Sequence, residues 1–446
     1  MTELPEGWTV VSLKDIAKVE WGNTNITKKS YTDDGYPAFS ASGSDGFLND
    51  YEWEGAAVIL SAIGARCGKC FLAEGKWTAI KNTIVIQDKT QLIDHRLLYY
   101  YLNDDSKWSI SGSGQPFITM GTAHEVSYPF PPRNEQRRIA AKLETLLGRV
   151  DAAQTRLAIV PRILKRFRQS VLASACSGQL TADWREGNPK TKAVSFSFES
   201  NDLTNNRELP SNWAVVRAGD IISDLKYGTS QKCGYEKRGV PVLRIPNIGD
   251  GVIDTTDLKY GNLPPREVDQ LKLSAGDILL IRSNGSVSLV GKSALVSKRE
   301  SGFAYAGYLI RLRANRSYVV PEFLNLALSS HDVRLQIEVP ARSTSGVNNI
   351  NSDEVRALEI GVPPIAEQQE IVRRVEVLFK TADALEARYR NAKAHVDKLT
   401  QSILAKAFRG ELVPQDPNDE PASVLLDRIQ TARAGRARKN RQRRET

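Results

Sequence analysis

The sequence has few of the features that mark secreted, disulfide-rich or membrane proteins. Four cysteines among 446 residues are too few for a disulfide framework and fit a reducing compartment, so we expect a cytoplasmic protein. No run of about 18 apolar residues is present, and we therefore expect no membrane span. The start, MTELPEGWTV, has no basic stretch followed by an apolar one, which argues against a secretory signal.

The sequence also lacks any arrangement of residues that predicts a catalytic centre. None of the four histidines stands near a plausible serine or cysteine nucleophile motif. They are His95, His124, His331 and His395. We predict no catalytic residues and no cofactor bound by this chain itself.

Two short motifs resemble ligand sites without completing them. Cys67 and Cys70 have the spacing of zinc ligands, but no second pair of Cys or His accompanies them. The segment 285–293 approaches a phosphate-binding loop, but Ser286 stands where such a loop requires glycine, and we expect a strand to follow. We predict no metal site and interpret the cysteines as structural.

The positive charge is concentrated at one end of the chain. Of the net charge of +9, the terminal segment TARAGRARKNRQRRET carries +6, which leaves about +3 for the remainder. A basic segment of this kind is typical of disordered tails that contact phosphates without sequence preference. The body of the chain is not strongly basic, so charge alone does not predict a nucleic-acid partner.

What the sequence does contain is a long internal duplication. PFPPRNEQRRIAAKLETLLGRVDAA begins at Pro129, and GVPPIAEQQEIVRRVEVLFKTADAL begins at Gly361, 232 positions later. A second pair, LPEGWTVVSLKDIA from Leu4 and LPSNWAVVRAGDII from Leu209, is offset by 205. The second copy therefore has 27 additional residues in its middle, where the two copies also differ most. Similar ends and different middles indicate one scaffold that carries two different surfaces.

Each copy continues as apolar residues spaced alternately by four and three. This pattern spans more than four heptads in both copies and predicts long helices that pair as a left-handed coiled coil. A Pro-Pro pair precedes each helix, and Gly178 or Gly410 follows it, so we expect the helices to begin and end there. Pro161 predicts a kink or a break in the first helix. Because the chain supplies two matching patterns, we expect each helix to pack against the other, in antiparallel orientation.

The regions before the helices are predicted to be compact α+β domains with polar loops. Paired apolar runs around a Gly-containing turn, EGAAVILSAIGARCGKCFLA and AGDILLIRSNGSVSLVGKSALV, predict strands. TAIKNTIVIQ and AYAGYLIRLRA predict further strands, and HRLLYYYLND and PEFLNLALSS predict short helices.

Taken together, these residues resemble the specificity subunits of type I restriction-modification enzymes, over nearly the whole chain. The most specific pieces are LPEGW, PPRNEQRRIAAKLETLLGRVDA and LKRFRQSVLASACSGQLTADWR in the first copy. In the second copy they are PPIAEQQEIVRRVEVLF, LTQSILAKAFRGEL and SGVNNI. One departure is that the second copy ends VPQDPNDEP where the first ends TADWRE.

The resemblance implies a non-catalytic subunit whose two target-recognition domains each read one half of an asymmetric, bipartite DNA site. The helices would space the halves and dock two methyltransferase subunits. Those subunits would bring S-adenosylmethionine for adenine methylation, and up to two restriction motor-nuclease subunits would bring ATP and Mg²⁺.

We therefore predict an α+β fold: two β-rich target-recognition domains separated by a pair of long antiparallel coiled-coil helices, with pseudo-two-fold symmetry. The expected domains are target-recognition domain 1 (1–130), helical spacer 1 (131–185), a linker (186–208), target-recognition domain 2 (209–362), helical spacer 2 (363–414) and a disordered basic tail (415–446).

Base-reading residues should be Arg, Lys, Asn, Gln or hydroxyl side chains in the loops that differ between the copies. In the first domain the candidates are Asn23, Thr24, Lys28, Lys29, Ser40, Ser42, Arg66, Lys69 and Gln115. In the second they are Lys226, Gln231, Arg244, Asn247, Arg282, Asn284, Lys292, Arg342 and Asn348.

Two other functions remain open from the sequence. A stand-alone adenine-N6 DNA methyltransferase would need an Asn/Asp-Pro-Pro-aromatic motif, and no Pro-Pro pair here is preceded by Asn or Asp. A duplicated coiled-coil scaffold that binds only proteins would show the same helical pattern without reading DNA.

Overall fold

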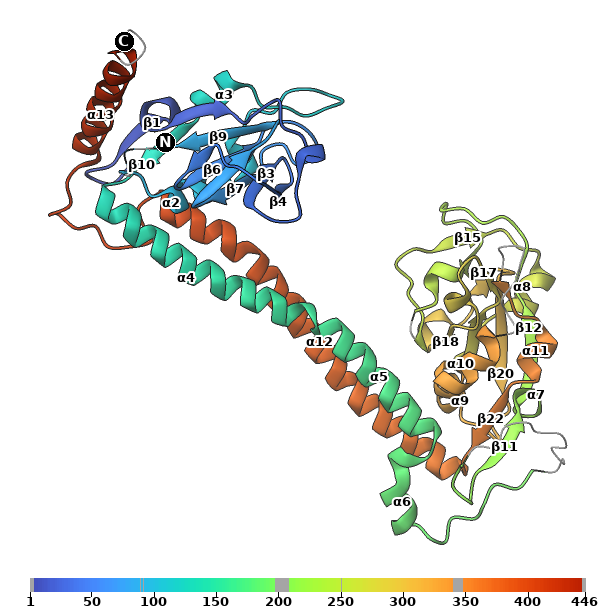
Figure 1. Ribbon diagram of the computed structural model, residues 1–446. Helices are drawn as coiled ribbons and strands as arrows, with labels where there is room; N and C mark the ends of the chain where they lie inside the picture. Colours follow the sequence, from blue (N-terminus) through green and yellow to red (C-terminus); the bar gives the residue numbers. More distant parts are fainter. Residues whose placement is uncertain are drawn as a thin grey trace. The chain divides into compact units, whose positions relative to one another are not determined.

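The computed structural model describes residues 4–88, 90, 92–196, 208–249, 251–339 and 348–442. The chain divides into two compact units. Unit 1 comprises Met1–Ala158 and Asn391–Thr446, and unit 2 comprises Ile159–Arg390 (Figure 1). Each unit contains one of the predicted β-rich domains and part of the helical repeat.

In unit 1 the ends of the β-rich domain are held together by β1 (Thr9–Ser12), which pairs antiparallel with β10 (Ser127–Phe130). Two four-stranded sheets lie between them, in the orders β2-β9-β6-β7 and β4-β3-β8-β5. Their strands are β2 (Lys18–Trp21), β3 (Tyr36–Ser40), β4 (Gly43–Leu48), β5 (Trp53–Glu54), β6 (Ala57–Ser61), β7 (Cys70–Ala73), β8 (Lys76–Ala79) and β9 (Thr83–Gln87). The helices are α1 (Leu13–Ile16), α2 (His95–Leu102) and α3 (Met120–His124).

The central strands of unit 1 are apolar along their whole length because both of their faces are covered. Val58 and Leu60 of β6 face a core that includes Leu98 of α2. Their neighbour Ile59 faces a second core, which includes Trp77 from the other sheet. Alternate residues of a strand point to opposite faces, so a strand buried on both sides loses its polar alternation.

Unit 2 repeats this plan with a larger sheet. β11 (Ala214–Arg217) pairs antiparallel with β22 (Glu359–Val362), and the main sheet has the order β12-β20-β16-β18-β14. Its strands are β12 (Ile222–Tyr227), β14 (Gly251–Val252), β16 (Asp277–Ile281), β18 (Ser293–Leu295) and β20 (Leu309–Ala314). The smaller sheets contain β13 (Val240–Leu243), β15 (Lys259–Gly261) and β19 (Ala304–Tyr305), and β17 (Ser283–Asn284) with β21 (Asn348–Asn349).

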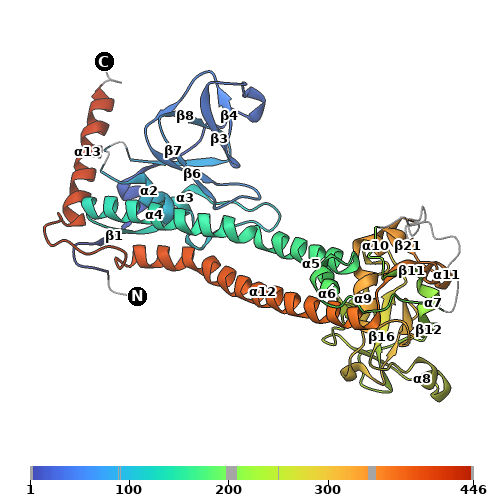
Figure 2. The same ribbon diagram turned by 90° about the horizontal axis from the view of Figure 1, so that it is seen from below.

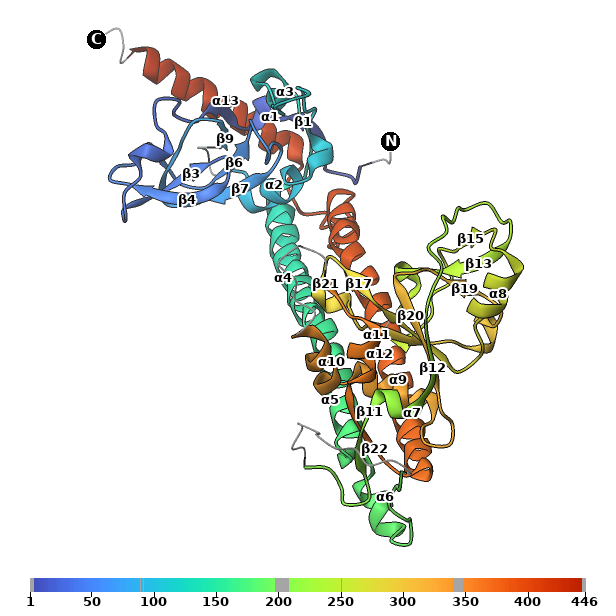
Figure 3. The same cartoon turned by 90° about the vertical axis from the view of Figure 1, so that its right-hand side faces the viewer.

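The main sheet of unit 2 is again buried on both faces. Ile278 and Leu280 of β16 pack in a core with Phe323 of α9 (Pro321–Ser329). Leu279, between them, packs in a second core with Tyr305 of β19. Figure 3 shows α9 and α10 (His331–Glu338) on one side of this sheet, and β13, β15, β19 and α8 (Pro265–Leu271) on the other. The remaining helices are α7 (Ala218–Ile221) and α11 (Ser352–Arg356). The predicted strands and short helices of both domains are confirmed.

The repeated helices begin and end where the sequence predicts. α4 (Arg133–Ala158) and α12 (Ile365–Phe408) each start directly after a Pro-Pro pair. The first copy breaks at Ile159, beside Pro161, and continues as α5 (Val160–Cys176), followed by α6 (Ala182–Gly187), so the predicted interruption is confirmed. Gly178 and Gly410, just beyond the two helix ends, have φ of +78° and +72°, the left-handed conformation that glycine adopts most readily.

Within unit 1, the start of α4 packs against the end of α12, as both Figure 1 and Figure 2 show. Ile139 and Leu143 of α4 share a core with Ile403 and Ala407 of α12. Both views show these two segments running in opposite directions, as predicted.

Within unit 2, α5 and the first half of α12 are also antiparallel. Val171 packs with Ile371 and Val375, whereas Arg168, nearer the start of α5, contacts Asp383 further along α12 at 2.7 Å. The heptad pattern is only partly buried, since Phe167 and Leu385 are 37% and 47% exposed.

The predicted disordered tail from residue 415 is wrong for most of its length. Ala422–Gln442 form helix α13, which lies against α1 in unit 1 (Figure 3). Ala422, Leu425 and Ile429 are 0–1% exposed and belong to the unit 1 core. These residues follow helical spacing and form an apolar stripe, which outweighs the basic composition of the segment that follows.

None of the helices in the described ranges combines the length and the hydropathy that a membrane span requires.

Candidate nucleic-acid interface

Two of the candidates of unit 1, Lys28 and Ser40, meet at the carboxylate of Asp45. Lys28 Nζ lies 2.5 Å from Asp45 Oδ2, and Ser40 Oγ donates to the same oxygen at 2.7 Å. Tyr31 donates its hydroxyl hydrogen to Asp45 Oδ1 at 2.8 Å. Burial acts to raise the pKa of Asp45, but the hydrogen bonds from Lys28, Ser40 and Tyr31 outweigh it and lower the pKa below its usual value. The Asp45 carboxylate is therefore charged and holds Lys28, Ser40 and Tyr31 in place. Ser40 is buried, at 3% exposure.

Ser42 and Arg66 extend this arrangement. The Ser42 backbone N–H donates to Ser40 Oγ at 3.0 Å, and Arg66 Nη1 donates to the Ser42 carbonyl at 3.0 Å. The structure thus brings Lys28, Ser40, Ser42 and Arg66 together, although they are up to 38 positions apart. We call this group, with Tyr31 and Asp45, the Asp45 network.

Lys69 and Gln115 lie beside this network. Lys69 belongs to the same turn as Arg66, since its backbone N–H donates to the Arg66 carbonyl at 3.0 Å, and its ammonium lies 3.1 Å from Asp105. Gln115 is exposed next to Pro116, whose carbonyl accepts from Gly64 N–H at 2.9 Å, and Gly64 begins that turn.

The three other candidates of unit 1 lie near the start of the domain. Asn23 forms a β-bridge with Ile80, and its amide donates to Glu52. Thr24 and Lys29 are exposed. Among the described residues, the link between these three and the Asp45 network is that Lys29 follows Lys28.

In unit 2, Arg282, Asn284 and Asn348 come together where β17 pairs with β21. The register places Asn284 opposite Asn348, and Asn348 Nδ2 donates to the Gly285 carbonyl at 3.0 Å. The guanidinium of Arg282, two residues earlier, lies 4.6 Å from the centre of the Tyr227 ring. Because the two asparagines are 64 residues apart, the sequence alone did not predict that they lie together.

Arg244 and Asn247 form a second group, with different roles. Arg244 Nη2 donates to Asp257 Oδ2 at 2.8 Å, and its guanidinium lies 5.9 Å from the Tyr235 ring. Asn247 is 1% exposed; its amide accepts from Arg244 N–H and donates to the carbonyls of Asp254 and Asp257 at 2.8–2.9 Å. Asn247 therefore holds the loop together, and it could reach DNA only if that loop rearranged.

The remaining candidates of unit 2 are dispersed. Lys226 lies on β12 and donates to Gln270 at 3.3 Å, and Gln231 is exposed and donates to Glu267 at 3.3 Å. Lys292 precedes β18, where its carbonyl accepts from Ile281 N–H at 2.9 Å. Arg342 lies outside the described residues.

The two motifs that resembled ligand sites have local roles. Cys67 and Cys70 donate to the carbonyls of Ala62 and Leu102 at 3.3 and 3.4 Å, and burial raises the pKa of both thiols. The segment 285–293 leads into strand β18, as predicted.

Sequence reasoning missed the polar anchors that hold each helix to its domain. Glu135, 1% exposed, accepts from Trp8 Nε1 at 2.8 Å and from Gln415 Nε2 at 2.7 Å. Burial raises the pKa of Glu135, and these hydrogen bonds oppose that rise only in part. Gln136, beside it, accepts from the Asp94 N–H at 2.9 Å. The Glu-Gln pair at the same place in both copies was the available signal.

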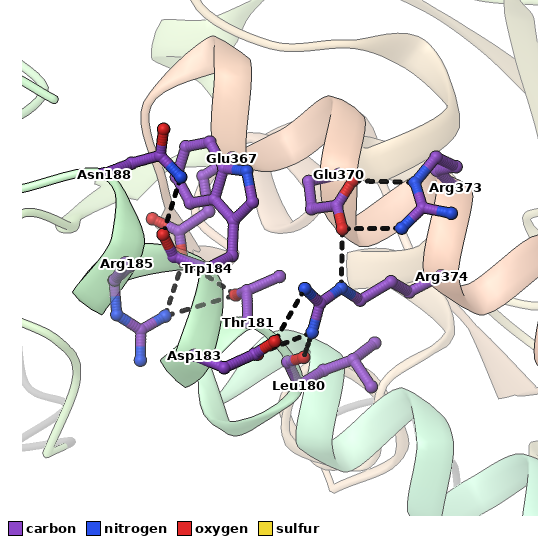
Figure 4. A network of polar contacts seen from close by, with 10 residues as sticks. All are labelled: Leu180, Thr181, Asp183, Trp184, Arg185, Asn188, Glu367, Glu370, Arg373 and Arg374. Atoms are coloured by element: carbon purple, nitrogen blue, oxygen red, sulfur yellow. Dashed lines mark hydrogen bonds and ion pairs between the residues drawn. The ribbon is translucent and has the colours of Figure 1, made fainter.

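The equivalent anchor in unit 2 uses a different set of donors (Figure 4). Glu367, 0% exposed, accepts from Thr181 at 2.8 Å and from Asn212 at 3.0 Å, and it pairs with Arg185 at 2.5 Å. Gln368 accepts from the Val320 N–H at 2.7 Å, as Gln136 does from Asp94.

One to two turns further along α12, a second ion-pair group joins this helix to the segment after α5 (Figure 4). Arg374 donates to Asp183 at 2.6 Å and to the Leu180 carbonyl at 2.8 Å. Glu370 accepts from both Arg373 and Arg374. The bonds from Arg373, then those from Arg374, lower the pKa of Glu370 to about 2 against the opposing effect of burial. The TADWRE segment of the first copy thus supplies Asp183 and Arg185 to α12.

Comparison with known proteins follows the same division of the chain. The family model for the type I restriction modification DNA specificity domain matches twice, at residues 5–161 and 210–393. The chain is 31% identical over 480 aligned positions to the type I restriction enzyme EcoDI specificity subunit of Escherichia coli, covering 97% of this chain and 96% of that protein. It is 37% identical over 319 residues to the EcoKI specificity subunit of Escherichia coli K12, covering 69% of this chain and 64% of that protein.

Two solved structures share the fold. A chain from a structure of a type I restriction-modification system, described in terms of complex assembly and conformational transition, has a TM-score of 0.66 at 21% identity. That match covers 92% of this chain and 99% of the other. The HsdS subunit of Thermoanaerobacter tengcongensis has a TM-score of 0.55 at 20% identity, covering 92% and 98%.

Proposed function

The chain belongs to the family of type I restriction-modification DNA specificity subunits, and we propose that its two units read the two unlike halves of one DNA site. Members of this family are recognition subunits and do not themselves carry out catalysis. Two alternatives, a stand-alone adenine methyltransferase and a scaffold that binds only proteins, are not supported by these relationships.

The proposal rests on the observation that the two units share one backbone framework but present different polar surfaces. Gly22 and Gly228 occupy matched positions, where a side chain would strike the carbonyls of Ile80 and Ala306 at 2.4–2.5 Å. Around this common framework, unit 1 presents the Asp45 network, and unit 2 presents Arg282 with two asparagines. Unlike hydrogen-bonding groups on like frameworks are what two different half-sites require.

We further propose that the paired helices set the separation between the half-sites and dock two methyltransferase subunits. Ile159, at the break between α4 and α5, and Ile163 of α5 are 56% and 55% exposed, and Val377 on α12 is 54% exposed. Exposed apolar side chains on a helix pair are suited to packing against further helices.

In this proposal, the partner subunits carry out the catalytic reactions. Methyltransferase subunits would bind S-adenosylmethionine and methylate adenine, and up to two restriction subunits would use ATP and Mg²⁺ to translocate and cut DNA. The chain described here would contribute sequence recognition, with phosphate contacts supplying much of the affinity, so binding should weaken steeply as salt rises.

The decisive experiment is to express the chain with its methyltransferase partner and map methylated adenines across the host genome. We expect one asymmetric, bipartite motif that disappears when this chain is omitted. Methylation that is unchanged by the omission would reject a recognition role.

The spacing role has a separate test. Insertion of one heptad into both repeated helices should lengthen the unspecified gap of the motif and leave both half-sites unchanged. An unaltered gap in an active complex would show that the helices do not set the spacing.

A further inference from the structure

Arg282 is held in a fixed orientation on the surface of unit 2. Its guanidinium lies 4.6 Å from the centre of the Tyr227 ring. Tyr227 is itself fixed, because its hydroxyl oxygen accepts from the Ser352 N–H at 2.8 Å. The Arg282 backbone donates to the Tyr308 carbonyl at 2.8 Å and accepts from the Ile350 N–H at 2.9 Å. Stacking on a fixed ring and bonds on both sides of the backbone restrict where the guanidinium can point.

This guanidinium has no carboxylate partner among the described residues, which sets it apart from the other arginines around it. Every other partly or fully buried arginine in the described part of unit 2 pairs with Asp or Glu. These are Arg168, Arg185, Arg244, Arg311, Arg313, Arg334 and Arg374. Arg282 Nε is buried and has no hydrogen-bond acceptor within the described ranges. A charged fork that is oriented but not neutralised is suited to an acceptor from outside the unit.

The matched position in unit 1 shows that this arginine is specific to one unit. Ala62 has the same backbone bonds as Arg282: it accepts from the Ile118 N–H at 2.8 Å and donates to the Asn82 carbonyl at 2.9 Å. The aromatic platform is present in both units, because Trp21 pairs with Ile84 as Tyr227 pairs with Ile310. The framework is therefore shared, and the arginine is the difference.

We propose that Arg282 reads a guanine in the half-site of unit 2, by donating two hydrogen bonds to O6 and N7 of that base. The proposal rests on the proposed function and adds the residue and the base. A guanidinium fork matches the two acceptors of guanine in the major groove. A phosphate contact would serve both half-sites equally, since the backbone of DNA is the same in each. A base contact that tells the two half-sites apart needs a residue that differs between the units.

The test uses the complete complex of this chain with its methyltransferase subunits, and the readout is the methylated motif across the genome. For Arg282→Ala, we expect one guanine of one half-site to become degenerate, with discrimination at that position reduced about 5- to 150-fold. The other half-site and the gap should not change. For Arg282→Gln, we expect adenine to be tolerated at the same position, because glutamine matches the N6 and N7 groups of adenine.

The contrary outcomes are distinct. If Arg282→Ala weakens methylation at all sites with the motif unchanged, and Arg282→Lys restores it, the residue contacts phosphate and the proposal fails. If all three variants leave both motif and rate unchanged, Arg282 does not contact DNA and the proposal also fails. Arg299→Ala, which removes an exposed arginine of the same unit, is the matched control and should behave as the unaltered chain.

Failure of this proposal can be told apart from failure of the proposed function. If the unaltered complex yields no bipartite motif, the recognition role itself is wrong. Should Arg282→Ala fail to assemble, Arg282→Gln and Arg282→Lys keep a long polar side chain over Tyr227. The base preference of those two variants then decides between guanine and phosphate.

Discussion

Both units anchor their helix through a buried glutamate, but the side chains that donate to this glutamate differ. In unit 1, Glu135 is held by Trp8 and Gln415, two neutral donors. In unit 2, Glu367 is held by a cation, Arg185, while Trp213, the counterpart of Trp8, has no acceptor for its indole N–H among the described residues. A duplicated framework therefore preserved the buried carboxylate and replaced its partners. Polar partners can be exchanged in this way when each buried acceptor remains satisfied.

The largest expected effect is loss of the charged anchor. Glu367→Ala would leave Arg185 without its carboxylate and should lower the stability of unit 2 by about 3 kcal/mol. Glu135→Ala removes an acceptor that is used by two neutral donors, and it should lower the stability of unit 1 by about 2 kcal/mol. Hydrogen exchange of the full chain, followed by mass spectrometry, would locate the loss in each unit. Glu376→Ala, at an exposed position of the same helix, should have little effect, and equal losses for both anchors would contradict the comparison.

The second effect concerns α13, which belongs to unit 1 and has no counterpart in the described part of unit 2. Ile429→Ala removes a side chain that is 0% exposed and should cost about 2 kcal/mol, at the low end for buried Ile because a surface helix can adjust. Faster exchange should appear in α13 and α1 and not in unit 2. Val424→Ala, at a residue 40% exposed on the same helix, is the control. Unchanged exchange in α1 would mean that α13 does not support the unit 1 core.

The third effect should be the same in both units, because the two helix ends are built alike. Gly178 and Gly410 have positive φ, and a Cβ would lie 2.5 Å from Pro210 or 2.2 Å from Pro5. Each Gly→Ala change should cost about 1–2 kcal/mol from the backbone conformation alone. Urea unfolding would measure it. Gly148→Ala, at an open position within α4, should instead stabilise by about 0.5–1 kcal/mol, and destabilisation there would undermine this interpretation.

The smallest effect is a pH dependence confined to unit 1. Burial lowers the pKa of His95, against the opposing charges of Asp88 and Asp94, and His95 Nε2 accepts from the Asp88 N–H at 3.0 Å. The folded unit favours neutral imidazole, so stability should fall as pH drops below the ordinary value of about 6.5, where the unfolded chain binds the proton first. Unit 2 has Pro321 at the matched position. Urea unfolding at about pH 7.5 and about pH 5.5 should show a smaller difference for His95→Gln; an equal difference would exclude His95 as the cause.

Much of the fold followed from local patterns in the sequence. The Pro-Pro pairs, the heptad spacing and the two glycines predicted where α4, α5 and α12 begin and end, including the break at Pro161. The apolar runs of β6 and β16 predicted buried strands. The candidate site was predicted less well, because residue type and loop position do not say which side chains are already engaged. Asn247 fits the pattern of a base-reading residue, yet its amide is used within its own loop.

By itself, the sequence determined the duplication and most of the secondary structure, because helix spacing, strand alternation and turn residues act over a few neighbouring positions. Its repeated motifs also carried the resemblance to the family. Only the tertiary structure decided which donors satisfy Glu135 and Glu367, whose partners lie as far as 280 positions away. It also decided that α13 folds onto unit 1 and that Arg282 lacks a carboxylate among the described residues. Such pairings depend on where whole segments pack, since a buried charge takes whatever partner the packing brings within hydrogen-bond distance.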